Sequence, residues 1–310
     1  MTLMFNRRRF LAISAAMTVA SPAIATPVAR WQGTALGAGA SLQIVGMTQS
    51  AADPVFAAIR NELDRLEGIL SLYIDDSELS VLNRDGRLAA PSPDILSVLS
   101  LANSLHLATQ GAFDPTVQPL WSAHAQATQA GRTLSGQELA QLRQRIGWQH
   151  VEFDAQTVRF SRPDMAITLN GIAQGYITDQ IAATLREQGL TDVMVDMGEI
   201  SALGGRSDGG PWRAGIADVQ GHIVQKVSLR DRALATSSPL GTVLNASSEI
   251  GHILDPRNDD APKQSLVSVS ARDAALADGL STALCLMDRG QFPAVLEKFP
   301  SAKLEWVVLS

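Results

Sequence analysis

The chain has 310 residues, of which 45% are hydrophobic and 18% are charged, so it can bury a sizeable core and is not expected to be disordered. Its formal net charge is −6, and an acidic protein is poorly suited to binding nucleic acid non-specifically. The single cysteine, Cys285, excludes an internal disulfide, and the apolar run around it predicts a buried, inert thiol.

The first 25 residues have the pattern of an export signal. Arg7 to Arg9 precede Phe10 and a short apolar run, and Ala23-Ile24-Ala25 offers a cleavage site of small residues. The consecutive arginines favour a twin-arginine signal over an ordinary secretory signal, and the apolar run is too short to span a membrane well. We therefore expect export to the periplasm. Cleavage would remove three arginines and no acidic residue, which changes the net charge from −6 to −9.

The mature region, residues 26–310, is expected to form one domain, in which two intimately packed subregions are possible. Residues 26–33 look like a leader into the fold, and residues 122–134, which are polar and Ala-rich, look like an exposed insertion. Apolar residues at helical spacing and capping residues predict helices at 53–70, 77–83, 93–109, 135–146, 172–188, 273–287 and 291–299. Short apolar or alternating runs predict strands at 41–44, 151–153, 158–160, 165–169, 193–195, 201–203, 212–216, 223–229, 233–237, 266–270 and 303–309.

The strands cluster in the second half of the chain, with helices between them. This order does not follow strict strand–helix alternation. It predicts an α+β fold of mixed, mainly antiparallel sheets flanked by helices.

The stretch from Thr168 to Asp179 joins a predicted strand to a predicted helix through a turn at Asn170-Gly171. The start of a helix presents free backbone N–H groups and a positive dipole end, which suit a phosphate or another anion. The same pattern is also typical of a buried strand–helix connection whose glycines only allow close packing. This stretch by itself does not distinguish the two interpretations.

Asp278, Ser281 and Thr282 lie at positions i, i+3 and i+4 of a predicted helix, so they share one helix face. Carboxylate and hydroxyl oxygens suit a hard cation such as Mg²⁺ rather than zinc. Two side chains are too few for a closed cage, so such a metal would take its other ligands from backbone carbonyls, water and substrate phosphates. The alternative is a partly exposed polar helix face without a ligand.

Two other clusters could carry chemistry. His252 and Asp255 flank a strand end in the segment Gly251-His-Ile-Leu-Asp-Pro256, and a histidine can act as a general base. A surface histidine beside a turn is the more common situation. Tyr73 and the segment Ala112-Phe113-Asp114 place aromatic residues in loops, where they could stack on a planar base or belong to the local core.

Six motifs occur in the order seen in the ApbE family, the FAD:protein FMN transferases, and the chain resembles that family over about residues 30–310. Each motif is modest, but the ordered set is specific. The export signal together with Asn170–Gly175 and Asp196–Glu199 is most similar to the NosX branch, which serves nitrous oxide reduction. The six motifs are Ser71-Leu-Tyr-x-x-x-Ser-Glu-x-Ser-x-Leu-Asn83, Gly111-Ala-Phe-Asp-Pro-Thr-Val-x-Pro-Leu120, Gly171-Ile-Ala-Gln-Gly-Tyr176 with Asp179, Met197-Gly-Glu-Ile200, Gly251-His-Ile-Leu-Asp-Pro256, and Ser268-Val-Ser-Ala271 followed by Ala277-Asp-Gly-Leu-Ser-Thr282.

The resemblance implies a Mg²⁺-dependent reaction in which the FAD pyrophosphate is cleaved. FMN is joined through its phosphate to a Thr or Ser hydroxyl of an acceptor protein, expected to be membrane-bound, and AMP leaves. Such a transfer depends mainly on positioning and charge neutralisation. By the same resemblance His252 would assist deprotonation of the acceptor hydroxyl, with Asp255 as its orienter. The implied metal-site residues are Asp278, Thr282, the Gly171 carbonyl and, beside them, Ser281.

The resemblance also implies which residues contact FAD, with Tyr73 and the 112–114 segment at its adenine end. The expected contacts are Leu36, Tyr73, Ala112, Phe113, Asp114, Thr168, Gln174, Glu199 and Ile253.

Three of these positions depart from the usual family residues. The family commonly has Met at Leu36, Asp at Thr168, and Lys or Glu at Gln174. Leu36 can still make apolar contact, and Gln174 keeps hydrogen bonding without charge. These differences bear on FAD affinity more than on the metal site.

Two other functions use the same features. An exported carrier would hold FAD without transfer, and a Mg²⁺-dependent FAD pyrophosphatase would release FMN and AMP. The presence of Asp278, Thr282 and His252 favours catalysis over storage. The acceptor separates a transferase from a hydrolase, and its identity is not encoded in this chain.

Overall fold

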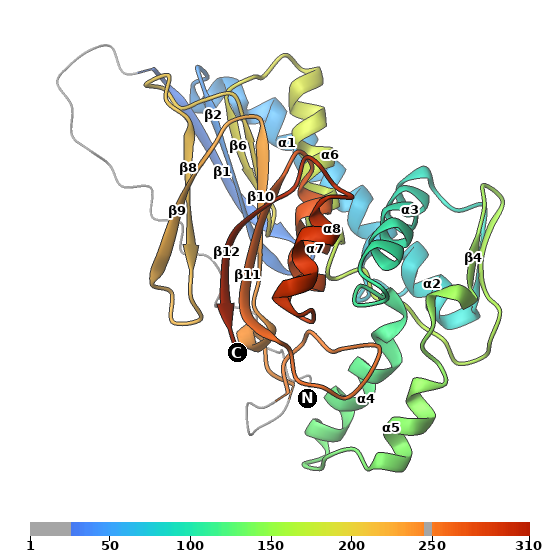
Figure 1. The fold of residues 1–310 in the computed structure, drawn as a ribbon. Coiled ribbons are helices and arrows are strands. Elements are labelled where there is room, and N and C mark those ends of the chain that lie inside the picture. The colour runs from blue at the N-terminus through green and yellow to red at the C-terminus, as the bar shows by residue number, and fades with distance from the viewer. Residues whose placement is uncertain (1–25, 245–249) are drawn as a thin grey trace.

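The computed structural model describes residues 26–244 and 250–310, so the predicted export signal lies outside the described residues. The body of the protein is a seven-stranded sheet in which every neighbouring pair of strands is antiparallel (Figure 1). In spatial order its strands are β1 (Val28–Ala35), β2 (Ala38–Val45), β6 (Val193–Asp196), β7 (Ile200–Leu203), β10 (Arg232–Ser237), β11 (Gln264–Ala271) and β12 (Lys303–Leu309).

One face of this sheet is covered by a hairpin. Its strands are β8 (Trp212–Ala217), which alternates buried and outward residues, and β9 (Ile223–Leu229), which does so only at its end, where Val227 and Leu229 are buried. Trp212, Ile216 and Leu229 from the hairpin form a separate buried cluster with Ile200 and Leu234 from the large sheet. The inward-facing apolar residues of the hairpin therefore produce a two-layer β packing on this side.

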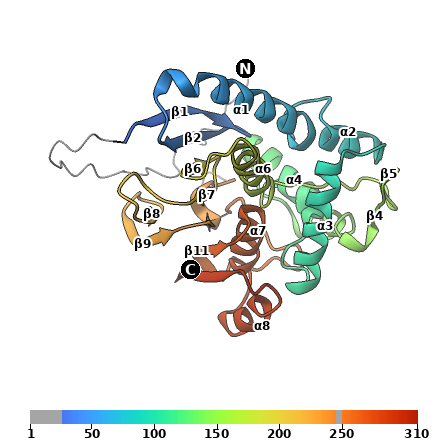
Figure 2. The same cartoon turned by 90° about the horizontal axis from the view of Figure 1, so that it is seen from above.

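Three helices cover the opposite face, as seen from above in Figure 2. They are α1 (Gln49–Leu70), α6 (Ala173–Glu187) and α7 (Ala274–Leu284). Their buried residues belong to one hydrophobic core that continues beyond the sheet into the helices on the right of Figure 1. The remaining helices are α2 (Glu78–Asp85), α3 (Pro93–Ala108), α4 (Gln118–Gln129), α5 (Gly136–Arg143) and α8 (Phe292–Leu296).

A small antiparallel sheet lies on the right of Figure 1. Its strands, in spatial order, are β3 (Arg87–Ala89), β5 (Thr157–Phe160) and β4 (Val151–Phe153).

The predicted α+β class, with mainly antiparallel sheets flanked by helices, is confirmed. In the described parts of the chain, no helix combines the length and the apolar character needed to cross a bilayer. Cys285 is buried as predicted, and this burial raises the pKa of its thiol.

Two sequence predictions about organisation are wrong. Residues 26–33 are not a leader, because most of them form β1, which pairs with β2 along its whole length and buries Ala29 and Ala35. Residues 122–134 are not an exposed insertion, because most of them belong to α4. The Ala-rich composition of α4 lets it pack closely through small residues, and Ala125 and Ala127 are buried.

The strand predicted at residues 165–169 does not form. Instead the Asn83 side chain takes the place of a neighbouring strand, since its Oδ1 accepts the N–H of Ile167 at 2.8 Å and its Nδ2 donates to the Ile167 carbonyl at 2.8 Å. The Thr168 N–H donates to the Pro115 carbonyl, also at 2.8 Å. The segment is extended and apolar, which explains the strand-like pattern, but its backbone groups are satisfied by side-chain and loop partners.

The helix boundaries follow the capping residues closely. Ser77 caps α2, and Ser135 forms a reciprocal capping box with Glu138 at the start of α5, as the spacing predicts. Helix α1 starts one turn earlier than predicted, with the Thr48 side chain as its cap.

Candidate active site

The turn before α6 meets α7 at the centre of the molecule. Gly171 lies against Thr282, so that a Cβ atom at Gly171 would be 3.0 Å from the Thr282 hydroxyl oxygen. One turn further along α6, the N–H of Gly175 donates to Asp278 Oδ2 at 3.2 Å. The fold therefore brings Gly171 beside the helix face of Asp278 and Thr282, although about a hundred residues separate these segments in the sequence.

Close packing of α6 on α7 depends on Gly175 and Asp179. A Cβ atom at Gly175 would lie 2.4 Å from the Ala274 carbonyl oxygen. Four residues later, the two Asp179 oxygens accept the N–H groups of Ala274 at 2.7 Å and Ala275 at 2.9 Å. A carboxyl group does lie at a helix start, but it is the protein's own Asp179 side chain, and the helix is α7 rather than α6. Sequence reasoning missed this role of Asp179.

Replacing Gly175 with Ala is expected to lower the free energy of unfolding by about 1–3 kcal/mol, because the added methyl group overlaps the α7 backbone. Gly68 in α1 is the matched control, since a Cβ atom there meets nothing within 4 Å. Gly68→Ala should stabilise the protein by about 0.5–1 kcal/mol through helix propensity. Urea unfolding of both variants measures the difference, and equal effects would contradict the packing argument.

Four carboxylates gather around this junction, and burial raises the pKa of each one. The pKa is raised to about 7 for Asp278 and Asp179, and to about 6 for Asp196. The pKa of Glu199 is raised well above its ordinary value by burial and then by the neighbouring charges of Asp278 and Asp196. Ionisation therefore places several like charges in a poorly solvated region, where a bound cation would compensate them.

The donor set at this junction fits Mg²⁺. The carboxylate of Asp278 and the hydroxyl of Thr282 are hard oxygen donors on one face of α7, next to the backbone of Gly171. Among residues 26–244 and 250–310, no cluster of three or more His, Cys, Asp or Glu side chains could hold a metal ion by itself. A metal here would be completed by backbone oxygens, water and substrate phosphates.

A third hydroxyl joins Ser281 and Thr282. The Oγ of Ser237, at the end of β10, lies 2.7 Å from the Oγ of Ser281 and 3.3 Å from the Oγ1 of Thr282. Ser281 is fully buried and donates to the Asp278 carbonyl at 3.0 Å. Ser281 is thus held away from solvent as a support for its neighbours. Sequence reasoning missed Ser237, whose only local signal is a hydroxyl-rich strand end, Thr236-Ser237-Ser238.

The stability of the metal-free protein is expected to fall as the pH rises from about 5 to about 7.5. The pKa values of Asp278, Asp179 and Asp196 are raised in the folded protein. These groups therefore stay protonated at pH values at which the same groups in the unfolded chain are already ionised. Their contribution is fully present below the unfolded pKa of about 4 and is lost as the pH passes the folded pKa values. Thermal unfolding in a chelator measures this trend, and a midpoint that rises with pH across this window would contradict it.

His252 is held by the short 3-10 helix Pro239–Gly241 and the residue that follows it. Its Nδ1 lies 3.1 Å from the Pro239 carbonyl and 3.2 Å from the Thr242 carbonyl. Because carbonyl oxygens only accept hydrogen bonds, Nδ1 carries the hydrogen in the neutral ring and Nε2 carries the lone pair. Gly251 permits this approach, since a Cβ atom there would lie 2.1 Å from the Pro239 carbonyl oxygen.

Asp255 is buried, and its observed hydrogen bonds connect it to Arg257. Its Oδ1 accepts from the Arg257 N–H and Nε, both at 2.9 Å, and its Oδ2 accepts from an Arg257 terminal nitrogen at 2.7 Å. These contacts give no support to the expected role of Asp255 as the orienter of His252. The two carbonyls that bind Nδ1 hold the ring instead.

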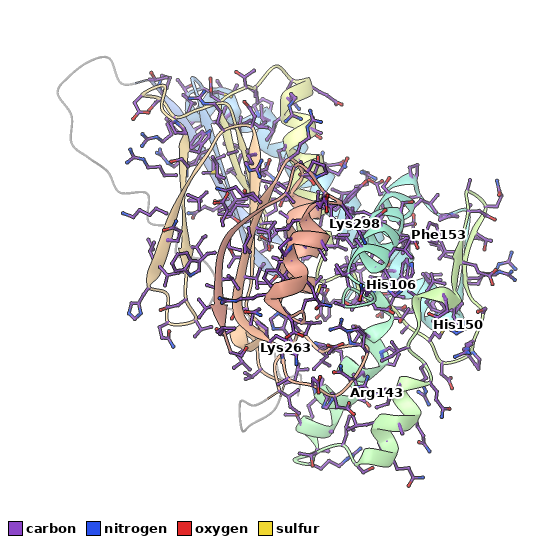
Figure 3. The ribbon with its side chains drawn as sticks, viewed as in Figure 1. His106, Arg143, His150, Phe153, Lys263 and Lys298 are labelled. Atoms are coloured by element: carbon purple, nitrogen blue, oxygen red, sulfur yellow. The ribbon has the colours of Figure 1, made fainter. Side chains whose placement is uncertain are left out.

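The loop that follows His252 is bound to two other parts of the molecule. Arg257 also donates to the Leu286 carbonyl at 2.8 Å, just beyond α7. Arg143 of α5, labelled in Figure 3, donates to the Pro256 carbonyl at 3.2 Å and pairs with Asp259. The loop is therefore tied both to the helix of Asp278 and to α5.

The residues expected at the adenine end of FAD differ in accessibility. Tyr73 is 62% exposed, so much of the residue lies at the surface. Ala112 and Phe113 are buried in the core. Asp114 accepts from the N–H and Oγ1 of Thr116 at 2.8 and 2.6 Å, so it shapes its own loop, and burial raises its pKa.

The other expected FAD contacts lie on four separate segments. Leu36 forms the β1–β2 turn, and Ile253 is buried beside His252. The Gln174 side chain packs on Gly198, since a Cβ atom at Gly198 would lie 2.5 Å from Gln174 Nε2. Gln174 therefore covers the turn that carries Glu199. The Thr168 hydroxyl accepts the Asn170 N–H at 3.2 Å and shapes the turn before α6.

The architecture is that of flavin transferases of known structure. The flavin transferase ApbE from Vibrio cholerae superimposes with a TM-score of 0.76 at 26% identity, covering 88% of this chain and 91% of that one. The apbe protein from Thermotoga maritima gives a TM-score of 0.76 at 26% identity, with 91% and 94% covered.

The sequence comparisons agree with this class. The ApbE family model matches residues 36–306, and the chain belongs to the ApbE family. The FAD:protein FMN transferase of Vibrio cholerae is 32% identical over 254 residues, which covers 77% of this chain and 76% of the relative. The enzyme of the same description from Klebsiella pneumoniae is 27% identical over 288 residues, with 88% and 81% covered.

Proposed function

We propose that this protein is a FAD:protein FMN transferase that moves FMN from FAD to a Thr or Ser hydroxyl of an acceptor protein and releases AMP. The observation that carries the proposal is the meeting of the Gly171 turn with Asp278 and Thr282. Those three residues would hold Mg²⁺, which when bound offsets the charge of the FAD pyrophosphate. Ser237 and Ser281 would keep the Thr282 hydroxyl in position through their hydrogen bonds.

His252 would act as the general base of the transfer. Its Nδ1 is occupied by two carbonyls, so the lone pair of the neutral ring lies on Nε2. The acceptor hydroxyl oxygen would form a bond to the FMN phosphorus while the bond from that phosphorus to the AMP oxygen breaks. The hydroxyl proton would pass to Nε2, and the displaced oxygen would leave as part of the AMP phosphate.

FAD would lie between the segments that carry the predicted contacts. Tyr73 offers an exposed ring for stacking on the adenine, and Leu36 offers an apolar contact. Gln174, over the Glu199 turn, can donate and accept hydrogen bonds without adding charge.

The cellular setting is part of the same proposal. The arginines and the small-residue cleavage site in residues 1–25 support export by a twin-arginine signal to the periplasm, with residues 26–310 as one mature ApbE-like domain. An acceptor in a membrane-bound respiratory protein, or in the nitrous oxide reduction system served by the NosX branch, would be consistent with this location.

The mature protein should be incubated with FAD, Mg²⁺ and candidate membrane acceptors that carry a Thr-containing motif. A fluorescent flavin band that survives denaturing electrophoresis, together with AMP release, supports the transferase. AMP and FMN released without a covalent band would indicate a FAD pyrophosphatase. FAD bound without any turnover would indicate a carrier.

A further inference from the structure

Leu36 occupies an unusual backbone conformation at the tip of the β1–β2 hairpin. The two turn residues, Leu36 and Gly37, have φ angles of 47° and 78°, as in a type I′ turn. Glycine takes this region without strain, but a leucine is disfavoured there because its Cβ approaches the backbone. Strained residues of this kind persist where the surrounding structure holds them, and they gather at binding sites.

One side chain holds this turn from another element. Glu67, near the end of α1, accepts the N–H of Leu36 on its Oε1 at 2.6 Å, although the two residues are 31 positions apart. A hydrogen bond to a carboxylate is shorter and stronger than one between neutral groups. It is therefore well suited to offset the cost of the left-handed conformation of Leu36.

The same residue also anchors the chain that leads to Tyr73. The Glu67 carbonyl accepts the N–H of Ser71 at 3.1 Å, and the Ser71 hydroxyl accepts the N–H of Tyr73 at 3.0 Å. Leu36 is partly buried against the main core, whereas Tyr73 is largely exposed. The bond to Ser71 is a backbone bond at the end of α1, so the Glu67 side chain acts on Leu36 alone, while both segments lie near the same end of the helix.

We propose that Glu67 is a positioning residue for FAD: its carboxylate holds Leu36 in the left-handed conformation so that the leucine side chain packs against a ring system of FAD. This inference rests on the proposed function. The backbone of a two-residue turn would form more easily with glycine at position 36. Leu36 is only partly buried against the core, so part of its side chain remains accessible for a further contact that glycine could not make.

A double-mutant cycle on FAD binding tests the coupling. The variants are Leu36→Ala, Glu67→Ala and the double variant, and the readout is the Kd for FAD from flavin fluorescence. Each single substitution should weaken FAD binding about tenfold, and the double variant should bind no more weakly than Leu36→Ala alone. Glu67→Gln, which keeps an acceptor for the Leu36 N–H, should recover most of the affinity. Asp64→Ala, on an exposed position of the same helix, should leave the Kd unchanged.

Leu36→Gly separates binding from folding. It relieves the strain at a φ of 47° but removes the packing of Leu36 on the core, so the melting temperature should change little while FAD binding weakens at least as much as in Leu36→Ala. Titrations with FMN and with AMP identify the ring involved, because only the fragment that carries this ring should bind more weakly to Leu36→Ala.

Three results would overturn the inference. Additive losses in the double variant would show that Glu67 does not act through Leu36. A lowered melting temperature with an unchanged Kd in Glu67→Ala would show that Glu67 serves folding alone. An unmodified protein that does not bind FAD would overturn the proposed function as well, whereas the first two results would leave that function intact.

Discussion

The Asp278→Asn variant is expected to lose at least about a hundredfold in the rate of FMN transfer, because an amide cannot replace the charge of a buried carboxylate toward Mg²⁺. The variant should nevertheless fold as well as the unmodified protein. At about pH 8 in a chelator it should melt at an equal or higher temperature, since the replaced carboxyl has its pKa raised to about 7 by burial and is charged there. Transfer assays and melting curves with and without Mg²⁺ measure both effects.

Mg²⁺ should raise the melting temperature of the unmodified protein and leave that of Asp278→Asn almost unchanged. Asp273→Asn is the matched control, because Asp273 is an exposed residue at the start of the same helix and its side chain makes no capping hydrogen bond. This control should keep both the activity and the response to Mg²⁺. Equal Mg²⁺ stabilisation of the Asp278→Asn variant would place the metal elsewhere.

His252→Ala is expected to slow covalent flavinylation by about a hundredfold to ten-thousandfold, the usual contribution of a general base. Binding of FAD should change little, because the ring is held through Nδ1 by backbone carbonyls. Single-turnover transfer and a separate FAD titration distinguish the two steps.

His222→Ala is the control for loss of an imidazole, because His222 lies on the surface with 79% of its side chain exposed. It should transfer FMN at the normal rate. Near-normal flavinylation by His252→Ala with FAD binding intact would remove His252 from the mechanism. A loss of FAD binding in that variant would instead show that the residue shapes the cofactor site.

Much of the fold could be predicted from residues that act over short distances. The Ser135–Glu138 capping box and the apolar spacing along α1 depend on neighbours within a turn or two, so both were predictable. The extended segment at residues 165–169 looked like a strand because it is apolar. Its partner is the Asn83 side chain, 84 positions away, which no local pattern reveals.

The candidate site shows the same division. Asp278 and Thr282 share a helix face because of helical periodicity, and the oxygen chemistry of their side chains already indicated a hard cation. The participation of Ser237 could not be predicted, because it comes from the end of a strand that the sheet places beside α7. The Asp255 side chain could have faced His252 on sequence grounds, but its hydrogen bonds go to Arg257.

The stretch from Thr168 to Asp179 shows what the sequence determines and what only the tertiary structure decides. The sequence alone determined a turn, a helix and a set of residues able to bind an anion or to pack closely. Only the tertiary structure placed Gly171 against Thr282, joined Gly175 to Asp278, and used Asp179 to cap α7. The reason is that helical periodicity and capping are set by residues a few positions apart, whereas this site is built from hydrogen bonds and close packing between segments about a hundred residues apart.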